Sequence, residues 1–199
     1  MAVKALHKNF VTPVGRASFA HVFEATEQLN GQLAFSLAVL FPKSDKEGIS
    51  NIRKAIISAA KEKFGDDKAK WPKPLDNPLR DGDEKAEAGI TAYADSFYIN
   101  AKSKYQPGVV GSNLKPIMDA EEFYSGCYCR AQVNFYAYNK AGNKGVGVGL
   151  NNLMKVKDGD RLDDRQSAES AFGKYKTEDE DAPESSEGGE SEEDEDFFE

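Results

Sequence analysis

A run of twelve alternating residues, from Cys127 to Tyr138, constrains the fold of this chain more than any other feature. Successive side chains of an extended strand point to opposite faces, so the run divides into two sets. One face is small or apolar and carries Cys127, Cys129, Ala131, Val133, Phe135 and Ala137. The other carries Tyr128, Arg130, Gln132, Asn134, Tyr136 and Tyr138. This period of two predicts a β-strand with its first face in a core.

Similar alternation predicts further strands on both sides of this run. Arg16–Phe23 and Leu33–Phe41 alternate, with Leu33 on the buried face of the second, and the Asn30-Gly31 pair between them signals a hairpin. A further strand is predicted from Thr91 to Ala101. The final strands are expected over residues 145–150 and 151–156.

Between the predicted strands over 33–41 and 91–101, the spacing of the apolar residues changes from two to that of a helix. Ile49, Ile52, Ile56 and Phe64 recur at helical spacing, and Ser44 with Glu47 matches a capping box, so we expect a helix from about Lys46 to Phe64. Residues 68–83 contain three prolines and predict a long loop that carries Trp71, the only tryptophan. Several strands around one helix, in a domain spanning residues 1–176, predict an antiparallel barrel or sandwich with long loops.

Charge is distributed very unevenly along the chain. Residues 177–199 contain thirteen Asp and Glu and no Lys or Arg, which leaves all 26 basic residues and 21 of the 34 acidic residues in the preceding body. A basic body is compatible with nucleic acid, although the net charge of the whole chain is -8. The composition of residues 177–199 predicts disorder.

Catalytic and metal-binding patterns are not found. His7 and His21 lack zinc-ligand spacing, the glycines at 145, 147 and 149 do not match a dinucleotide fingerprint, and clustered carboxylates for metal-dependent hydrolysis are missing. We therefore expect no enzyme activity, no metal and no cofactor. Cys127 and Cys129 are poorly placed to bond to one another, and reduced thiols are expected.

The aromatic face of residues 128–138 is the strongest functional clue. Tyrosine rings beside an arginine can stack on unpaired bases of any sequence. Tyr98 and Lys102 lie on a matching polar face of the preceding strand, followed by Lys104 and Tyr105. The alternative is that these tyrosines pack beneath a loop, because tyrosine favours strands.

The C-terminus places two large apolar residues after a run of acids. The last six residues are Asp194, Glu195, Asp196, Phe197, Phe198 and Glu199. Two apolar anchors flanked by acids are typical of a short linear motif that binds a partner protein. The alternative is a tail that only increases solubility.

Several short motifs resemble a family of phage single-stranded DNA-binding proteins. They are residues 78–85 (PLRDGDEK, which include Arg80), 100–103 (NAKS), 124–130 (YSGCYCR), 144–146 (KGV), 149–152 (GLNN) and 157–160 (KDGD). The resemblance covers roughly residues 5–175. It implies an OB-like barrel, sequence-tolerant binding of single strands, and roles in replication, recombination and repair of phage DNA.

The aromatic strand face and its basic neighbours give the expected site, and the resemblance adds the expected setting. The expected DNA-binding residues are Tyr128, Arg130, Tyr136, Tyr138, Tyr98, Lys102, Lys104, Tyr105, Arg80 and Trp71. The expected protein partners are replication or recombination proteins that bind the tail, which resembles other single-strand binders except that Glu199 follows the phenylalanines. With no apolar run near the roughly 20 residues of a membrane span, we expect the protein in the cytoplasm of an infected bacterium. The alternative function is a scaffold that acts through its tail without binding nucleic acid.

Overall fold

The computed structural model describes residues 5–28, 31–140 and 142–162, all within the first of two units, Met1–Arg165. The expected boundary at residues 176 and 177 and the whole acidic tail lie outside the described residues. In the described part, no helix is long and apolar enough to cross a membrane.

Five long strands close into a ring. β2 (Gly15–Glu27) pairs with β3 (Leu33–Pro42), β3 with β5 (Ser96–Ser103), and β7 (Tyr128–Lys140) with both β2 and β8 (Asn143–Lys157). The ring closes where β5 and β8 run parallel, at the single pair Lys102 and Gly149. Every other pairing in the ring is antiparallel. This five-stranded arrangement confirms the predicted mainly β, OB-like barrel with one main helix.

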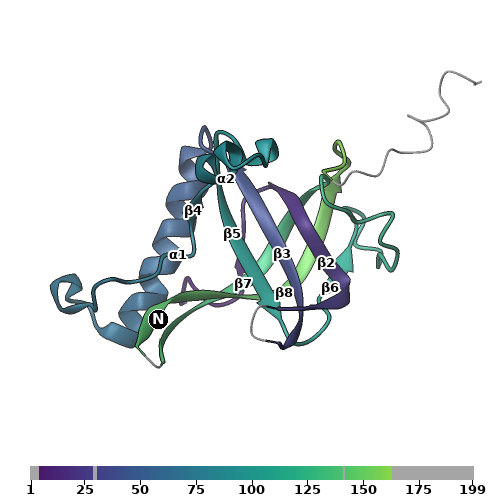
Figure 1. Cartoon of the computed structure of the whole chain (residues 1–199). Helices are drawn as coiled ribbons and strands as arrows, with labels where there is room; N and C mark the ends of the chain where they lie inside the picture. The colour runs from purple at the N-terminus through teal and green to yellow at the C-terminus, as the bar shows by residue number, and fades with distance from the viewer. Residues whose placement is uncertain (1–4, 29–30, 141, 163–199) are drawn as a thin grey trace, which may run out of the picture. The chain divides into compact units, whose positions relative to one another are not determined.

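Shorter elements extend the ring. β1 (Phe10–Val11) pairs with β7, β4 (Arg80–Asp81) pairs with β5, and β6 (Gly108–Val110) pairs with β8. The main helix, α1 (Lys46–Phe64), packs against β7 and β8, and α2 (Asp83–Glu87) lies near one end of β3 and β5 (Figure 1). Two helical turns, η1 (Lys68–Lys70) and η2 (Thr91–Tyr93), complete the elements.

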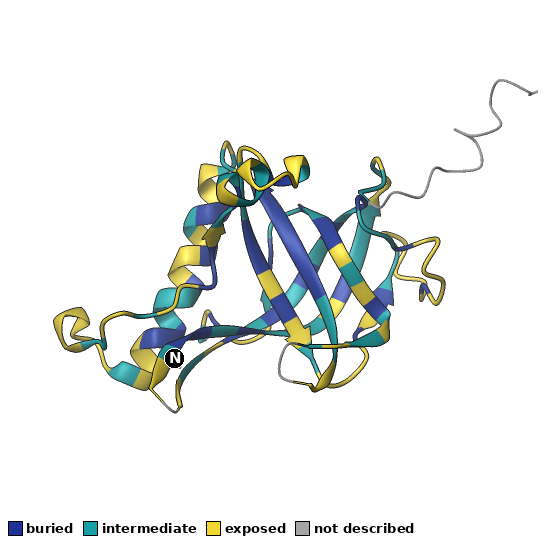
Figure 2. Ribbon diagram, in the orientation of Figure 1, coloured by how far each residue is buried: buried dark blue, intermediate teal, exposed yellow. Residues whose placement is uncertain are grey.

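The interior of the ring and the inner face of α1 share one apolar core. Cys127, Cys129, Ala131, Val133 and Phe135 are all buried in it, as the alternation predicted, and both cysteines are free thiols. Buried and exposed residues alternate along part of β5, whereas β3 is buried on both faces from Leu37 to Phe41 (Figure 2). The predicted alternation is wrong at Leu33, which is 66% exposed at the open end of β3.

Several predicted boundaries are also wrong. The cap of α1 is Asp45, whose carboxylate accepts from the Gly48 N–H, so the expected Ser44 capping box does not form. The predicted strand over 91–101 begins only at Ser96, because residues 91–93 form η2. The loop over 68–83 contains η1 and β4, and the two final strands are one continuous strand, β8.

Candidate nucleic-acid interface

Two tyrosine rings of β7 lie over glycines of β8 on the outer face of the ring. Tyr136 pairs with Gly147, and Tyr138 pairs with Gly145. A Cβ atom added to Gly147 would lie 2.6 Å from the Tyr136 ring, and one added to Gly145 would lie 2.7 Å from the Tyr138 hydroxyl oxygen. The alternate glycines of β8 therefore make room for the tyrosine rings of the neighbouring strand.

Tyr136 borders a groove with two lysines. Its ring is 54% exposed, and Lys102 and Lys104 are exposed at the end of β5. The groove has a volume of about 440 Å³ and is lined by Gln28, Gln32, Leu33, Ala34, Lys102, Ser103, Lys104 and Tyr136. A flat π surface beside two ammonium groups can stack on a base and neutralise phosphate charge.

The groove occupies the place where OB barrels bind oligonucleotides. That place is the face of the second and third barrel strands, together with the loops that join strands one to two and four to five. Here those strands are β3 and β5, and Gln28 and Gln32 lie in the connection between β2 and β3. Sequence reasoning missed Gln28, Gln32 and Leu33 in this groove. The Asn30-Gly31 turn signal located the loop, but nothing in the pattern linked it to the β7 tyrosines.

Tyr138 lies next along β7 and borders a second hollow. Its hydroxyl donates to the Asp76 carboxylate at 3.1 Å. Two main causes raise the pKa of Tyr138: the larger is burial of the hydroxyl, and the smaller is its interaction with the Asp76 carboxylate. Arg80 is exposed and forms an ion pair with the same Asp76 at 3.4 Å. The hollow measures about 610 Å³ and also includes Lys73 and Lys144. Asp76 therefore engages both predicted DNA-binding residues on this side.

Two predicted residues of β7 lie far from the groove. Tyr128 and Arg130 are eight and six residues from Tyr136, which corresponds to about 26 and 20 Å along a strand. The Lys157 ammonium covers the Tyr128 ring at 4.6 Å, and Arg130 donates to the Thr12 carbonyl at 3.0 Å. The structure therefore does not bring them together with Tyr136.

The remaining three aromatic residues have different environments. Tyr98 is only 5% exposed because Tyr93 packs on it, so its ring is covered in this conformation. Trp71 packs against the core and donates its indole N–H to the Gly65 carbonyl at 2.8 Å, which fits an anchor for the loop. Tyr105 is 83% exposed directly after β5.

The described residues contain no group of three His, Cys, Asp or Glu side chains that could hold a metal ion. Burial raises the pKa of the Cys127 and Cys129 thiols, which keeps them protonated rather than nucleophilic.

Comparisons with known proteins identify the fold and the family. The chain is 37% identical over 154 residues to protein p50 of Acyrthosiphon pisum secondary endosymbiont phage 1, covering 73% of this chain and 81% of that protein. Its fold matches a solved structure of the single-stranded DNA-binding protein of bacteriophage Enc34 in complex with ssDNA. That match has a TM-score of 0.66 and 20% identity, over 77% of this chain and 88% of the other.

A second solved structure has the same fold. It is gp2.5, a single-stranded DNA-binding protein of bacteriophage T7, with a TM-score of 0.59 and 14% identity over 87% of this chain and 97% of the other. Residues 8–183 match the family described as the Enterobacter phage Enc34 ssDNA-binding protein. The chain therefore belongs to this family of phage single-stranded DNA-binding proteins.

Proposed function

We propose that this protein binds single-stranded DNA with little sequence preference and without catalysing a reaction. The observation that carries the proposal is the exposed Tyr136 ring beside Lys102 and Lys104, in a groove on the binding face of an OB barrel. Family membership supports it, and the relatives with the same fold include a protein solved in complex with ssDNA.

The proposed contacts explain both the strand preference and the sequence tolerance. Every base has a π face, so stacking on Tyr136 accepts any sequence, whereas the bases of a duplex are already stacked on each other. Lys102 and Lys104 contribute phosphate contacts, which release counterions and make the affinity fall as salt rises. Tyr138 and Arg80 extend the contact surface toward the β7–β8 turn.

Membership of a phage family supports a proposed biological setting. A sequence-tolerant binder protects single strands during replication, recombination and repair of phage DNA, in the cytoplasm of the infected host. We assign partner recruitment to the acidic tail with Phe197 and Phe198, which lies outside the described residues. A scaffold that acts only through this tail is the competing function.

One titration separates the two functions. Fluorescence anisotropy of labelled oligo-dT, compared with a duplex of equal length at several salt concentrations, should show tighter binding of the single strand and a steep fall with salt. Equal affinity for the two forms would contradict the stacking mechanism, and no binding of either form would favour the scaffold.

A further inference from the structure

Phe19 is an exposed aromatic residue in a strained part of β2. Its φ is 47°, in the left-handed region that bulky side chains rarely adopt, and its side chain is 50% exposed. The β2–β3 register shifts between Ser18 and His21, so an irregularity turns Phe19 away from the regular pattern. Such bulges re-aim side chains beside functional sites, and backbone strain of this kind also concentrates there.

Lys85 of α2 lies over Phe19 and two further rings. Its Nζ is 5.5 Å from the Phe19 centroid, 4.5 Å from Tyr93 and 4.6 Å from Tyr98. Burial lowers the pKa of Lys85, and the positive charge of Arg80 adds to the effect. Lys85 takes part in none of the ion pairs found among the described residues, and the contacts found for its ammonium there are with these three rings.

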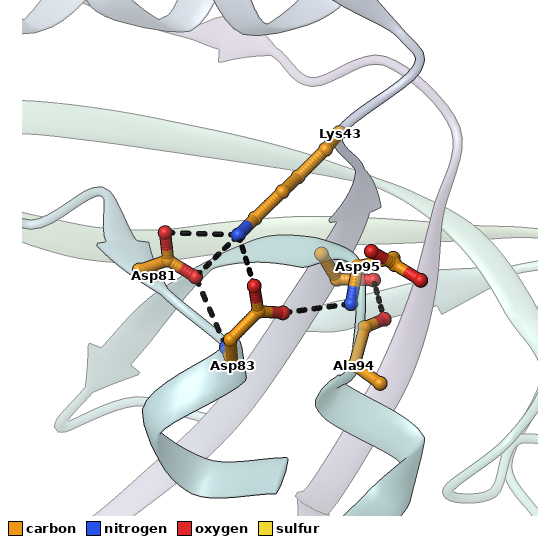
Figure 3. A network of polar contacts seen from close by, with 6 residues as sticks. Lys43, Asp81, Asp83, Ala94 and Asp95 are labelled. Carbon is orange, nitrogen blue, oxygen red and sulfur yellow. Dashed lines mark hydrogen bonds and ion pairs between the residues drawn. The ribbon is translucent and has the colours of Figure 1, made fainter. Parts of the chain in front are cut away.

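A polar network fixes the segment that carries Lys85. The Lys43 ammonium contacts the Asp81 carboxylate at 2.7 Å and the Asp83 carboxylate at 2.6 Å (Figure 3). Asp83 also accepts from the Asp95 N–H at 2.8 Å, and the Lys43 N–H donates to the Asp95 carbonyl at 2.8 Å. Asp83 begins α2 two residues before Lys85, and Asp95 follows Tyr93 by two residues. Both sides of the aromatic cluster are therefore tied to the end of β3.

The cluster lies on the same outer sheet face as the groove. Tyr98 is paired with Leu40 and Arg80, and four residues further along β5, on the same face, Lys102 is paired with Ser36. Four strand residues span about 13 Å. Ser36 belongs to β3, and on the other side of β3 it is paired with His21 of β2. His21 is exposed and lies between the position of Phe19 and the groove. A single strand of DNA leaving the groove along β5 would meet Phe19 and Lys85 next.

We propose that Phe19 and Lys85 form a second contact site for the same DNA strand, with the Phe19 ring stacking on a base and the Lys85 ammonium contacting a phosphate. This proposal rests on the single-strand binding proposed above. Lys85 is only partly buried, lies over three rings and has no carboxylate ion-pair partner within residues 5–28, 31–140 and 142–162, so a phosphate would supply the charge partner that it lacks there. Stacking of a base on Phe19 would explain why an exposed aromatic ring is held in a strained backbone conformation.

Three variants test the two contacts separately. Phe19→Gly removes the ring at a position whose positive φ glycine accepts without strain. Lys85→Met removes the charge and keeps most of the stem over the rings, and Lys85→Arg keeps the charge. Ile90→Ala is the matched control, because Ile90 is also a partly exposed apolar residue near α2 and has none of these ring contacts. Each variant is titrated with oligo-dT over a range of salt, and its melting temperature is recorded.

The second site predicts a distinct result for each change. Phe19→Gly should weaken binding about tenfold, as expected for one lost stacking contact. Lys85→Met should lower the slope of log affinity against log salt by about 0.7, the value of one phosphate contact on a single strand, and Lys85→Arg should restore it. Ile90→Ala should bind like the wild type.

Other outcomes would overturn the inference without confusing it with the proposed function. If folded Phe19→Gly and Lys85→Met bind oligo-dT as the wild type does, while Tyr136→Ala binds more weakly, the second site does not exist and single-strand binding stands. If the wild type does not bind oligo-dT, the proposed function itself fails. If Lys85→Met does not fold, acetylation of wild-type lysines decides: oligo-dT should protect Lys85, and equal labelling with and without DNA would contradict the contact.

Discussion

We expect DNA binding by the groove to depend most on Tyr136. Because its ring is 54% exposed and rests on a glycine rather than in the core, Tyr136→Ala should weaken oligo-dT binding by about 1–3 kcal/mol with little change in melting temperature. Tyr138→Phe is the comparison, since it keeps the neighbouring ring and removes only the hydrogen bond to Asp76. A large fall in melting temperature with unchanged affinity would show that Tyr136 is structural.

The glycines of β8 allow a second test at the residue scale. Gly147→Ala places a methyl group 2.6 Å from the Tyr136 ring and should displace it, so the affinity for oligo-dT should fall by a similar amount. Gly149→Ala is a matched control on the same strand face, because its added Cβ would meet nothing nearer than 3.7 Å. Equal affinities of the two variants would mean that the position of the ring does not matter.

Cys127 and Cys129 give a residue-scale test of the barrel core. Both are fully buried, and burial raises the pKa of each thiol. The native protein should therefore resist a thiol reagent such as DTNB, and both thiols should react after unfolding in urea. Rapid labelling of the native protein would show that β7 separates readily from the core.

At the scale of elements, the sequence predicts what depends on local pattern. α1 and the interior of β7 match their predicted ranges, because helical spacing and strict alternation each specify one buried face. Ser44 was mistaken for the cap because Asp45, one residue later, competes for the same role. Tyr98 lies on the predicted face, but its burial by Tyr93 and Lys85 depends on how the preceding residues 83–93 fold back over β5, which strand alternation does not specify.

The network of Lys43, Asp81 and Asp83 predicts a pH dependence of stability. Hydrogen bonding to Lys43 holds the pKa of Asp81 below its usual range, and hydrogen bonds to Asp81 and Asp83 raise the pKa of Lys43. Because its pKa is lower in the folded state, the Asp81 carboxyl group stabilises the fold at pH values above its unfolded pKa of about 4. This stabilisation is lost as the pH falls through the folded-state pKa. The raised Lys43 pKa contributes below about 10.5, and its contribution is lost as pH rises through the folded pKa.

The matching experiment compares wild type with Lys43→Met by thermal unfolding across pH. The melting temperature should be lower in the variant at neutral pH, and the difference should shrink below about pH 4 and in strong alkali. Lys54→Met, an exposed change on α1, is the control and should show no such profile. A difference that stays constant across pH would show that Lys43 acts through packing of its stem.

At the scale of the whole molecule, closure of the ring and assembly of the groove exceed what a sequence pattern can specify. The groove brings together Gln28 and Gln32, the end of β5 and Tyr136 of β7, which are far apart in the chain. The parallel pair of Lys102 and Gly149 that closes the ring is equally non-local. Alternation placed Tyr128 and Arg130 with Tyr136, but a strand of this length separates residues on one face by 20 Å or more. Local pattern therefore predicts faces, while topology decides which parts of a face meet.

The charge of the acidic tail predicts an effect on DNA binding. Thirteen acids in residues 177–199, tethered to a body with a surplus of basic residues, resemble a polyanion and should compete with DNA for the lysine-lined groove. Deletion of residues 177–199 should therefore tighten oligo-dT binding. A tethered competitor acts at high effective concentration, and salt screens its attraction, so the gain should be largest at low salt and shrink as salt rises.

A double substitution separates competition from partner binding. Phe197→Ala with Phe198→Ala keeps all thirteen acids, so the affinity for oligo-dT should stay near that of the wild type. The same change should abolish recruitment of replication or recombination proteins in pull-downs, because it removes both proposed apolar anchors while the charge of the tail stays the same. If the truncated protein binds DNA no more tightly at low salt and retains the same partners, the tail serves solubility alone. If the double substitution tightens DNA binding as much as the deletion does, the phenylalanines rather than the acids occupy the groove.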